Sequence, residues 1–132
     1  MIIDKQLLDS LTEQAKANPR LRQAYDLRTS PQDNSQRILN ACEPGTVLPI
    51  HRHRGSTETI VCLRGRCVQY IYDNDGNQTD AIYLQPNSDT VAMSVEVGQW
   101  HRLESLESGT VILECKDGAY APLAPEDILS VE

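Results

Sequence analysis

The sequence predicts an all-β fold, a small β-barrel or jelly roll, with a helical arm at its N-terminus. Two observations lead to this prediction. From residue 37 onward, short apolar and β-branched runs alternate with turn-forming residues at intervals of about ten, which is typical of antiparallel sandwiches and barrels. Before residue 37 the apolar residues follow a helical period instead. A chain of 132 residues is long enough for one domain with its own core and too short for two of ordinary size.

The arm is predicted to contain one helix over residues 4–18. Asp4 can cap its N-terminus, and Pro19 ends it. Four apolar residues recur at helical spacing along one face: Leu7, Leu8, Leu11 and Ala15. We expect a second helical turn from Leu21 to Leu27, followed by a loop of turn-forming residues over 29–36.

Eight β-strands are predicted after this loop, at residues 37–42, 47–53, 59–63, 67–72, 79–84, 90–95, 101–105 and 111–115. The Asp75-Gly76 pair is a signal for a hairpin. The predicted organisation is a helical arm and loop over 1–36, a barrel core over 37–117, and an acidic tail over 118–132 that packs on the domain.

The charge and hydropathy patterns exclude two classes of partner. A net charge of −7 opposes nucleic-acid binding, because a protein must displace the counterions of phosphates with a basic surface. The N-terminus has no basic segment followed by an apolar run, and no stretch approaches the roughly 18 apolar residues of a membrane span. We therefore expect a cytoplasmic protein with no nucleic-acid or membrane partner.

The four cysteines are predicted to be buried free thiols. Each lies in an apolar or strand-like run: Cys42, Cys62, Cys67 and Cys115. Thiols of cytosolic proteins stay reduced, and the chain contains no C-x-x-C pair that would favour a cysteine metal site.

The three histidines are the most informative residues of the chain. His51 and His53 are two residues apart in a predicted strand, so both side chains point to the same face. Glu58 follows after a short turn, and His101 lies at the start of a later strand that can face the first pair across a closed barrel. Imidazole and carboxylate ligands suit a divalent transition metal such as Zn, Fe, Ni or Mn, and we expect one ion per chain.

The spacing of these residues resembles the first motif of the cupin superfamily, whose members have an RmlC-like barrel: Gly45, five residues, His51-Arg-His53, four residues, Glu58, six residues and Gly65. The second cupin motif, Pro-x-Gly-x-x-His-x-x-x-Asn, is similar to residues 96–105. Gly98 and His101 match that motif, whereas Glu96 and Ser105 replace its proline and asparagine. The resemblance implies a small cupin barrel that holds the metal inside.

A narrower resemblance is to the WbuC family of cupin-fold metalloproteins. It extends from residue 1 to about residue 122 and is carried by Gln36-Arg37-Ile-Leu-Asn40-Ala, Pro44-Gly45, Pro49-Ile-His51-Arg-His53, Gly98-Gln-Trp100-His101 and Leu113-Glu114-Cys-Lys116-Asp-Gly118-Ala-Tyr120. Members of that family are often encoded with genes for bacterial surface polysaccharides. Where they tend to have Asn-Leu-His, this chain has Asp26-Leu27-Arg28.

Four further residues are candidates for the lining of the pocket: Arg37, Arg28, Gln99 and Tyr70. Arg37 and Asn40 differ in strand parity, so only one of them can face inward, and we favour Arg37. Each candidate also has an ordinary interpretation, as a solvated charge for the arginines and as a packing residue for Gln99 and Tyr70. Lys116 and Tyr120 are candidates for the rim of the pocket.

Three functions are possible for such a protein, two of them enzymatic and one not. The leading one is a metal-dependent cupin that acts as an isomerase or epimerase on a small polar molecule, a sugar or sugar-derived anion, in surface-polysaccharide metabolism. The others are an iron-dependent dioxygenase and a non-catalytic module that binds a small ligand through its metal. We also expect a homodimer, because pairing covers open sheet edges.

Overall fold

The N-terminal arm forms one helix, α1 (Lys5–Ala17), in the computed structural model, which describes residues 1–129. The Asp4 carboxylate accepts a hydrogen bond from the backbone N–H of Leu7, which satisfies one of the free donors at the helix start. The helix ends at Asn18, just before Pro19. The helix predicted from the sequence is therefore confirmed.

The second predicted helical turn, from Leu21 to Leu27, is wrong. This segment forms the strand β1 (Arg22–Asp26), which pairs antiparallel with the strand β2 (Ser35–Cys42). Leu21 has a positive φ of 57°, which turns the chain away from the helix and into the strand. A segment this short has little helical stability of its own, so pairing with β2 decides its conformation.

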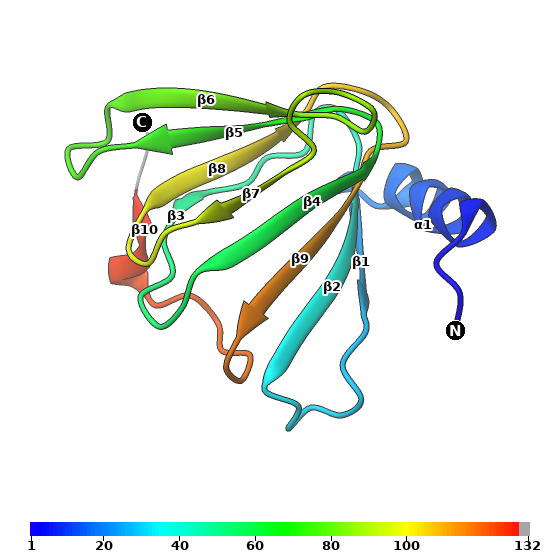
Figure 1. Ribbon diagram of the computed structural model, residues 1–132, viewed down its shortest axis with the longest axis horizontal. Coiled ribbons are helices and arrows are strands. Elements are labelled where there is room, and N and C mark those ends of the chain that lie inside the picture. The colour runs from blue at the N-terminus through cyan, green and yellow to red at the C-terminus, as the bar shows by residue number, and fades with distance from the viewer. Residues whose placement is uncertain (130–132) are drawn as a thin grey trace.

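Two five-stranded antiparallel sheets form the barrel (Figure 1), in the orders β1-β2-β9-β4-β7 and β10-β3-β8-β5-β6. The remaining strands are β3 (Ile50–His51), β4 (Glu58–Arg64), β5 (Cys67–Tyr72), β6 (Gln78–Leu84), β7 (Ala92–Val95), β8 (Trp100–Ser105), β9 (Val111–Asp117) and β10 (Ile128–Leu129). A short 3-10 helix, η1 (Pro125–Asp127), precedes β10. The predicted all-β fold with an N-terminal helix is confirmed.

The strand expected over 47–53 is reduced to the two residues of β3. Pro49 has no N–H to donate to a sheet, and Val47 is exposed, so the segment before β3 stays outside the ladder. The strands β1 and β10 were not predicted. Both depend on pairing with distant segments, β1 with β2 and β10 with β3.

Alternation along β2 separates two apolar clusters. The face that carries Cys42 points into the barrel, where it packs with Ile60 and Ile112 from neighbouring strands. The opposite face carries Leu39 and Ala41, which pack beneath the helix α1. The helix thus covers the outer face of the first sheet, as Figure 1 shows, and residues of β2 with the parity of Cys42 face the interior.

The turn between β4 and β5 requires glycine. Gly65 has a φ of +82°, and a Cβ atom at this position would lie 2.3 Å from Oγ1 of Thr110. Thr110 in turn accepts a hydrogen bond from the N–H of Arg66 through its hydroxyl. The last glycine of the first motif therefore fixes the close approach of this turn to the start of β9.

The cysteines are free, and Cys42, Cys62 and Cys67 are buried, whereas Cys115 is half-buried. Burial raises the pKa of the Cys42 thiol to about 12, which keeps it protonated and unreactive. Among the described residues, the helices are too short and too polar to cross a membrane.

Candidate metal centre

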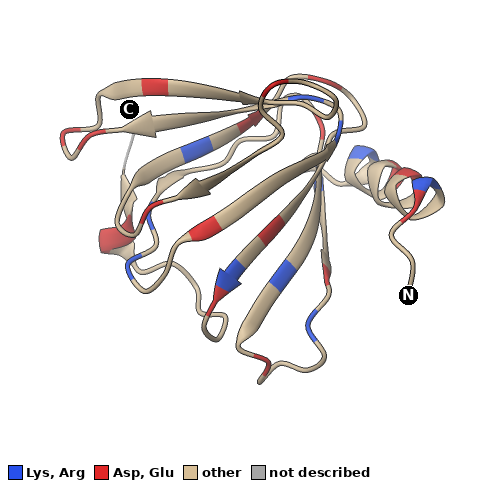
Figure 2. Cartoon of the chain, viewed as in Figure 1, with Lys and Arg blue, Asp and Glu red and all other residues tan. Residues whose placement is uncertain are grey.

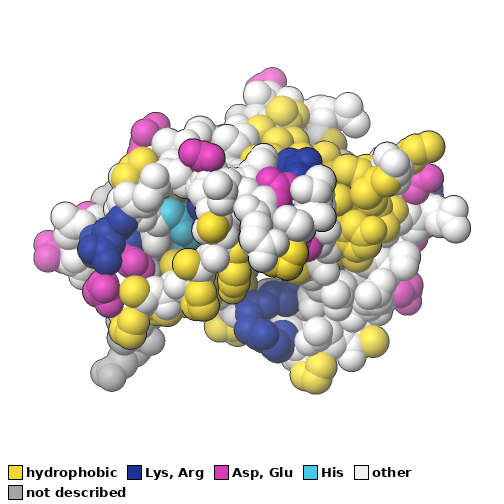
Figure 3. Space-filling view, turned by 90° about the horizontal axis from the view of Figure 1, so that it is seen from below, with side chains coloured by type: hydrophobic (Ala, Val, Ile, Leu, Met, Phe, Trp, Pro, Cys, Tyr) yellow, Lys and Arg dark blue, Asp and Glu magenta, His cyan; other side chains and the backbone are white. Residues whose placement is uncertain are grey.

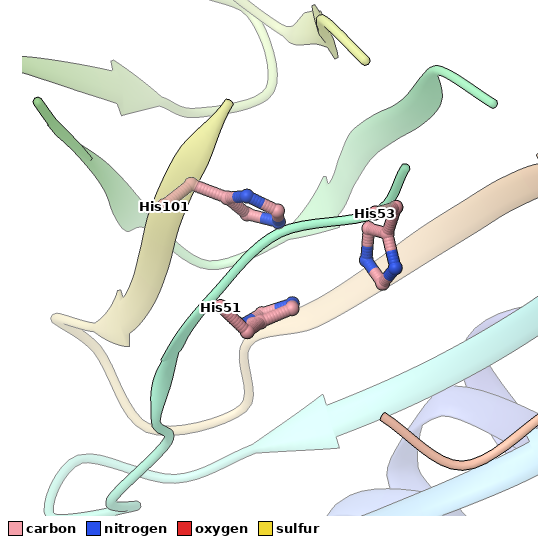
Figure 4. A group of neighbouring side chains, drawn as sticks. All are labelled: His51, His53 and His101. Atoms are coloured by element: carbon pink, nitrogen blue, oxygen red, sulfur yellow. The ribbon is translucent and has the colours of Figure 1, made fainter. Parts of the chain in front are cut away.

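Three histidine side chains meet inside the barrel. His51 ends β3, His53 follows two residues later, and His101 is the second residue of β8. His51 and His101 are direct partners in the antiparallel register, so their side chains leave the sheet on the same face. One ligand nitrogen from each ring lies within 4.8 Å of the others. Figure 4 shows the three rings converging from two segments that are far apart in the sequence.

Backbone carbonyls orient two of these rings. Nδ1 of His51 lies 3.0 Å from the carbonyl oxygen of Pro49, and Nδ1 of His101 lies 2.9 Å from that of Gln99. A carbonyl oxygen only accepts hydrogen bonds, so each Nδ1 carries the proton and each Nε2 keeps its lone pair. The two ligand segments are also tied together, because the N–H of Gly98 donates to the carbonyl of His53 at 2.8 Å.

Glu58 lies beside the three histidines, at the start of β4. Its two carboxylate oxygens are 3.3 Å from Nε2 of His53 and 3.5 Å from Nε2 of His101. Burial opposes the charged form of Glu58, but the adjacent His101 and His53 side chains outweigh burial and hold its pKa well below the ordinary value. The carboxylate is therefore ionised and close to the histidine nitrogens, although its role as a fourth ligand stays a prediction.

These residues fit a divalent transition metal. Nε2 of His53 and Nε2 of His101 are buried and have no hydrogen-bond partner within residues 1–129. Burial, followed by the nearby His101, lowers the pKa of His51 to about 4, so this ring is neutral at pH 7, which is the form that binds a metal. A buried nitrogen without a partner is costly, and an ion beside Nε2 of His101 would satisfy its lone pair. Nδ1 of His53 lies 3.2 Å from Nζ of Lys116.

The histidines open into a cavity of about 440 Å³ between the two sheets. Figure 3 shows a histidine side chain at the bottom of a hollow, with basic side chains on either side of it. Residues from both sheets and from the C-terminal segment line the cavity: Arg20, Arg22, Gln36, Ile38, Asn40, Leu48, Pro49, His51, His53, Glu58, Gln69, His101, Leu103, Glu114, Lys116, Tyr120, Ala121, Pro122 and Leu123. The volume is in the range of sites for small ligands.

The prediction that Arg37 lines the pocket is wrong, and the alternative, Asn40, takes that place. Residues 36, 38 and 40 of β2 face the interior, whereas Arg37 lies on the outer face. Its guanidinium donates to the Asp33 carboxylate at 2.8 Å. The parity argument was correct, but choosing between the two residues required the direction of the whole sheet.

Arg28, Gln99 and Tyr70 also lie outside the cavity lining. The Arg28 guanidinium pairs with Asp26 at 2.8 Å, and the amide of Gln99 donates to the carbonyl of Tyr72 at 2.9 Å. Tyr70 points outward from β5 and donates to Glu104 at 2.7 Å. Each side chain is held by a local partner, although Gln99 orients His101 through its backbone.

Sequence reasoning missed five polar residues of the cavity: Arg20, Arg22, Gln36, Gln69 and Glu114. Gln69 could have been found, because it alternates with Tyr70 along β5 and shares the parity of the buried Cys67. Arg22 was not accessible to such reasoning, since the segment from Leu21 to Leu27 was read as a helical turn. Lys116 and Tyr120, named as rim candidates, line the cavity.

Glu114 adds a titratable group to the cavity wall. Burial, assisted by the negative charge of Glu58, raises the pKa of Glu114 to about 8, while the positive charge of Lys116 acts in the opposite direction. The two glutamates lie on the adjacent strands β4 and β9, where Glu114 is opposite Ile60. Burial therefore favours the protonated form of Glu114, while the neighbours of Glu58 favour its charged form.

The C-terminal segment closes one side of the cavity with residues 120–123. It is anchored beyond this point by Asp127, whose carboxylate pairs with Arg52 at 3.0 Å and with Arg54 at 2.8 Å. The Arg52 guanidinium also lies 4.4 Å from the ring centre of Trp100 on the outer face of β8. These contacts hold the C-terminal segment against the part of the chain that carries the histidines.

Solved structures that resemble this chain have the cupin fold. Oxalate oxidase in complex with the substrate analogue glycolate is 13% identical with a TM-score of 0.64, over 82% of this chain and 56% of that one. The capsular polysaccharide assembling protein CapF from Staphylococcus aureus is 18% identical with a TM-score of 0.65, over 83% and 31%. KdgF from Halomonas sp. is 14% identical with a TM-score of 0.59, over 78% and 84%.

These likenesses establish the fold alone, and the chain spans about half the length of the oxalate oxidase chain that it matches. No curated protein matches the sequence. The family model described as "Domain of unknown function (DUF6016)" matches residues 3–84, which include His51, His53 and Glu58. Since this match covers more than half of the chain, the protein belongs to the DUF6016 family, and its cupin barrel brings together three histidines in a geometry that could hold a metal ion.

Proposed function

We propose that the protein is a metal-dependent cupin that acts on a small polar anion, a sugar or a sugar derivative. The observation that carries this proposal is the position of the histidine cluster, which opens into a cavity of about 440 Å³ with charged and amide side chains in its wall. A purely structural metal site is usually closed by protein ligands, whereas this cluster faces space for a ligand.

A divalent ion held by His51, His53 and His101, with Glu58 as the fourth ligand, would polarise an oxygen atom of a bound molecule. The protein's own residues surround that position. Burial favours the protonated form of the Glu114 carboxyl group, which suits a residue that exchanges protons with a ligand. Such an exchange supports isomerase or epimerase chemistry.

The link to surface-polysaccharide metabolism has two supports. The resemblance to the WbuC family is one, since that family is associated with such genes. The other is the similarity to CapF, which is described as a capsular polysaccharide assembling protein. Membership of the WbuC family stays part of the proposal, as does a cytoplasmic location, which agrees with four free thiols.

Iron-dependent dioxygenase chemistry is the second candidate. Three histidines and a carboxylate also suit iron, and one structure with this fold is an oxalate oxidase. The third candidate is a binding module without turnover. Oxygen uptake that depends on iron and on the ligand would favour the dioxygenase, turnover without oxygen would favour the isomerase, and binding without turnover would favour the module.

Metal loading and ligand titration test the proposal. The protein is stripped with a chelator and reloaded separately with Mn²⁺, Fe²⁺, Ni²⁺ or Zn²⁺, and both forms are titrated with citrate and D-gluconate by calorimetry. We expect about one ion per chain, and ligand binding that is much weaker in the stripped form. Equal binding by both forms would contradict a role of the metal in ligand binding.

Stripping should leave the fold intact. The apolar cluster inside the barrel consists of other residues than the histidines, so metal loss should lower the free energy of unfolding only by the mass-action term RT ln(1 + [L]/Kd). Circular dichroism of the stripped protein measures this. Collapse of the β-sheet signal would mean that the metal is a structural element and that the functional proposal is mistaken.

The homodimer also stays a proposal. The strands β1, β7, β10 and β6 are outermost in their sheets, and open edges favour association. Light scattering at tens of micromolar protein should give twice the mass of one chain. A monomer under these conditions would reject the dimer.

A further inference from the structure

The basic residues of the cavity differ from the other basic residues of the chain. Figure 2 shows basic and acidic residues interspersed over the sheets and the helix, and seven of the 12 lysines and arginines form ion pairs within residues 1–129. Two others, Arg66 and Arg102, lie over tyrosine rings. The three that remain, Arg20, Arg22 and Lys116, all line the cavity.

Arg22 is the most informative of these three. It is half-buried, its Nη1 donates to the carbonyl of Val47 at 3.3 Å, and no acidic partner for it lies within the described part of the chain. Burial and the adjacent Arg20 both lower the pKa of its guanidinium, which reflects a second positive charge nearby. In a chain of net charge −7, the half-buried Arg22 and the exposed Arg20 thus bring two positive charges without an acidic partner among residues 1–129 to the cavity wall.

Two buried acceptors lie in the same cavity. Oε1 of Gln69, a residue only 2% exposed, and Oδ1 of Asn40 have no hydrogen-bond partner among residues 1–129. A buried acceptor without a donor is costly, so both oxygens call for donors from a ligand. Hydroxyl groups provide such donors, whereas a purely acidic ligand would leave both oxygens unpaired.

Arg22 and Glu58 lie on different strands of the cavity wall. Arg22 belongs to β1, the outermost strand of its sheet, while Glu58 belongs to β4, three strands along in the order β1-β2-β9-β4. At a strand spacing of about 4.8 Å, these strands are about 14 Å apart. Asn40, on β2, lies between them.

From this arrangement we infer that the ligand is a polyhydroxylated molecule with an acidic group at each end: one end lies at the metal centre, the other on Arg20 and Arg22, and hydroxyl groups between them donate to Asn40 and Gln69. The distal acid is a carboxylate or a phosphate, since arginine recognises both. This inference rests on the proposed function for its metal end, but the arginine end stands on its own observations.

The experiment compares five probes on the Mn²⁺-loaded protein by calorimetry. D-Gluconate has one acid and D-galactarate has two, while 6-phospho-D-gluconate has a distal phosphate. Adipate has two acids without hydroxyls, and galactitol has hydroxyls without acids. We expect D-galactarate or 6-phospho-D-gluconate to bind about 10- to 100-fold more tightly than D-gluconate, since a charge-assisted contact is added. The tighter of the two identifies the distal acid, and adipate and galactitol should both bind more weakly than that probe.

Variants then assign the contacts. Arg22→Gln and the double variant Arg20→Gln/Arg22→Gln should abolish the preference for the second acid. Arg22→Lys should restore part of it. Gln69→Leu should weaken the hydroxylated probes and not adipate. The matched control is Arg66→Gln, which removes an arginine outside the cavity. Thermal melts check that each variant is folded.

Two kinds of failure are distinguishable. If the second acid brings no gain in affinity, or if the gain survives in the Arg20→Gln/Arg22→Gln protein, the inference is overturned while metal-dependent binding of D-gluconate stands. If loaded and stripped protein bind D-gluconate equally, the proposed function fails. Even if the proposed function fails, a preference for the second acid that requires Arg22 would support the binding of an acidic group by the arginines.

Discussion

Two regions of the barrel differ in whether their buried polar groups have hydrogen-bond partners. Around the turn at Gly109, the Glu43 carboxylate accepts hydrogen bonds from the Ser108 hydroxyl at 2.6 Å and from the Gly109 N–H at 2.7 Å. The Arg64 guanidinium nearby donates to Asp9 and to the carbonyl of Gly109 at 2.6 and 2.9 Å. This region, which we call the closed region, has a partner for each of these charges.

The cavity shows the reverse. Of the five buried side-chain atoms without a hydrogen-bond partner among residues 1–129, four belong to residues that line it: Asn40, His53, Gln69 and His101. Since unpaired buried polar atoms lower stability, a fold has no structural reason to gather them in one place. We infer that buried polar groups with hydrogen-bond partners have a structural role in this protein. Buried polar groups without partners are those available to bind a metal or a ligand.

The largest expected effect tests the cavity, where buried polar atoms lack partners. Replacing one histidine of the cluster, His101→Gln, should weaken metal binding by at least about 100-fold, because the loss of even a supporting contact costs 10- to 100-fold. Metal content after dialysis and competition with a chelator measure this. As controls, Cys42→Ala and Cys62→Ala should retain the metal. If a cysteine variant lost more metal than His101→Gln, the ligand set would be wrong.

The next effect tests the closed region. Glu43→Ala should lower the free energy of unfolding by about 1–3 kcal/mol, because it removes the buried carboxylate that accepts hydrogen bonds from the Ser108 hydroxyl and the Gly109 N–H. Denaturant unfolding of the stripped protein gives this value. Metal affinity should stay the same, and a drop in both quantities would mean that the two regions are coupled.

The last expected effect concerns pH. The pKa of Glu114 in the folded protein is about 8, above its ordinary value of 4.5, so between these values the folded state keeps a proton that the unfolded state loses. The stabilisation is full below pH 4.5 and is lost as the pH rises toward 8. Relative to wild type, Glu114→Gln in the stripped protein should gain stability on the order of 1 kcal/mol or more at high pH.

Urea unfolding at pH 5 and pH 9 measures this change. The matched control is Glu104→Gln, since Glu104 pairs with Tyr70 outside the cavity. Parallel pH profiles for wild type and Glu114→Gln would show that Glu114 is ionised in the folded protein and would remove it as a proton carrier.

Local signals in the sequence were enough for the fold class and for the histidines. Helical spacing with a cap at Asp4 and a proline after the helix predicted α1, because these effects act within a few residues. The period of two predicted that His51 and His53 would share a face. A motif with fixed spacing then joined His101 to them, and the structure brings all three rings together.

Only the tertiary structure decided which residues surround the metal centre. Strand parity divides a strand into two faces but does not say which face is inside, so Arg37 was chosen where Asn40 lines the cavity. Arg22 reaches the cavity because its segment pairs with β2, a contact between distant residues that outweighs local propensity. The sequence by itself therefore determined the chemistry of the metal centre, whereas long-range pairing determined the ligand surface around it.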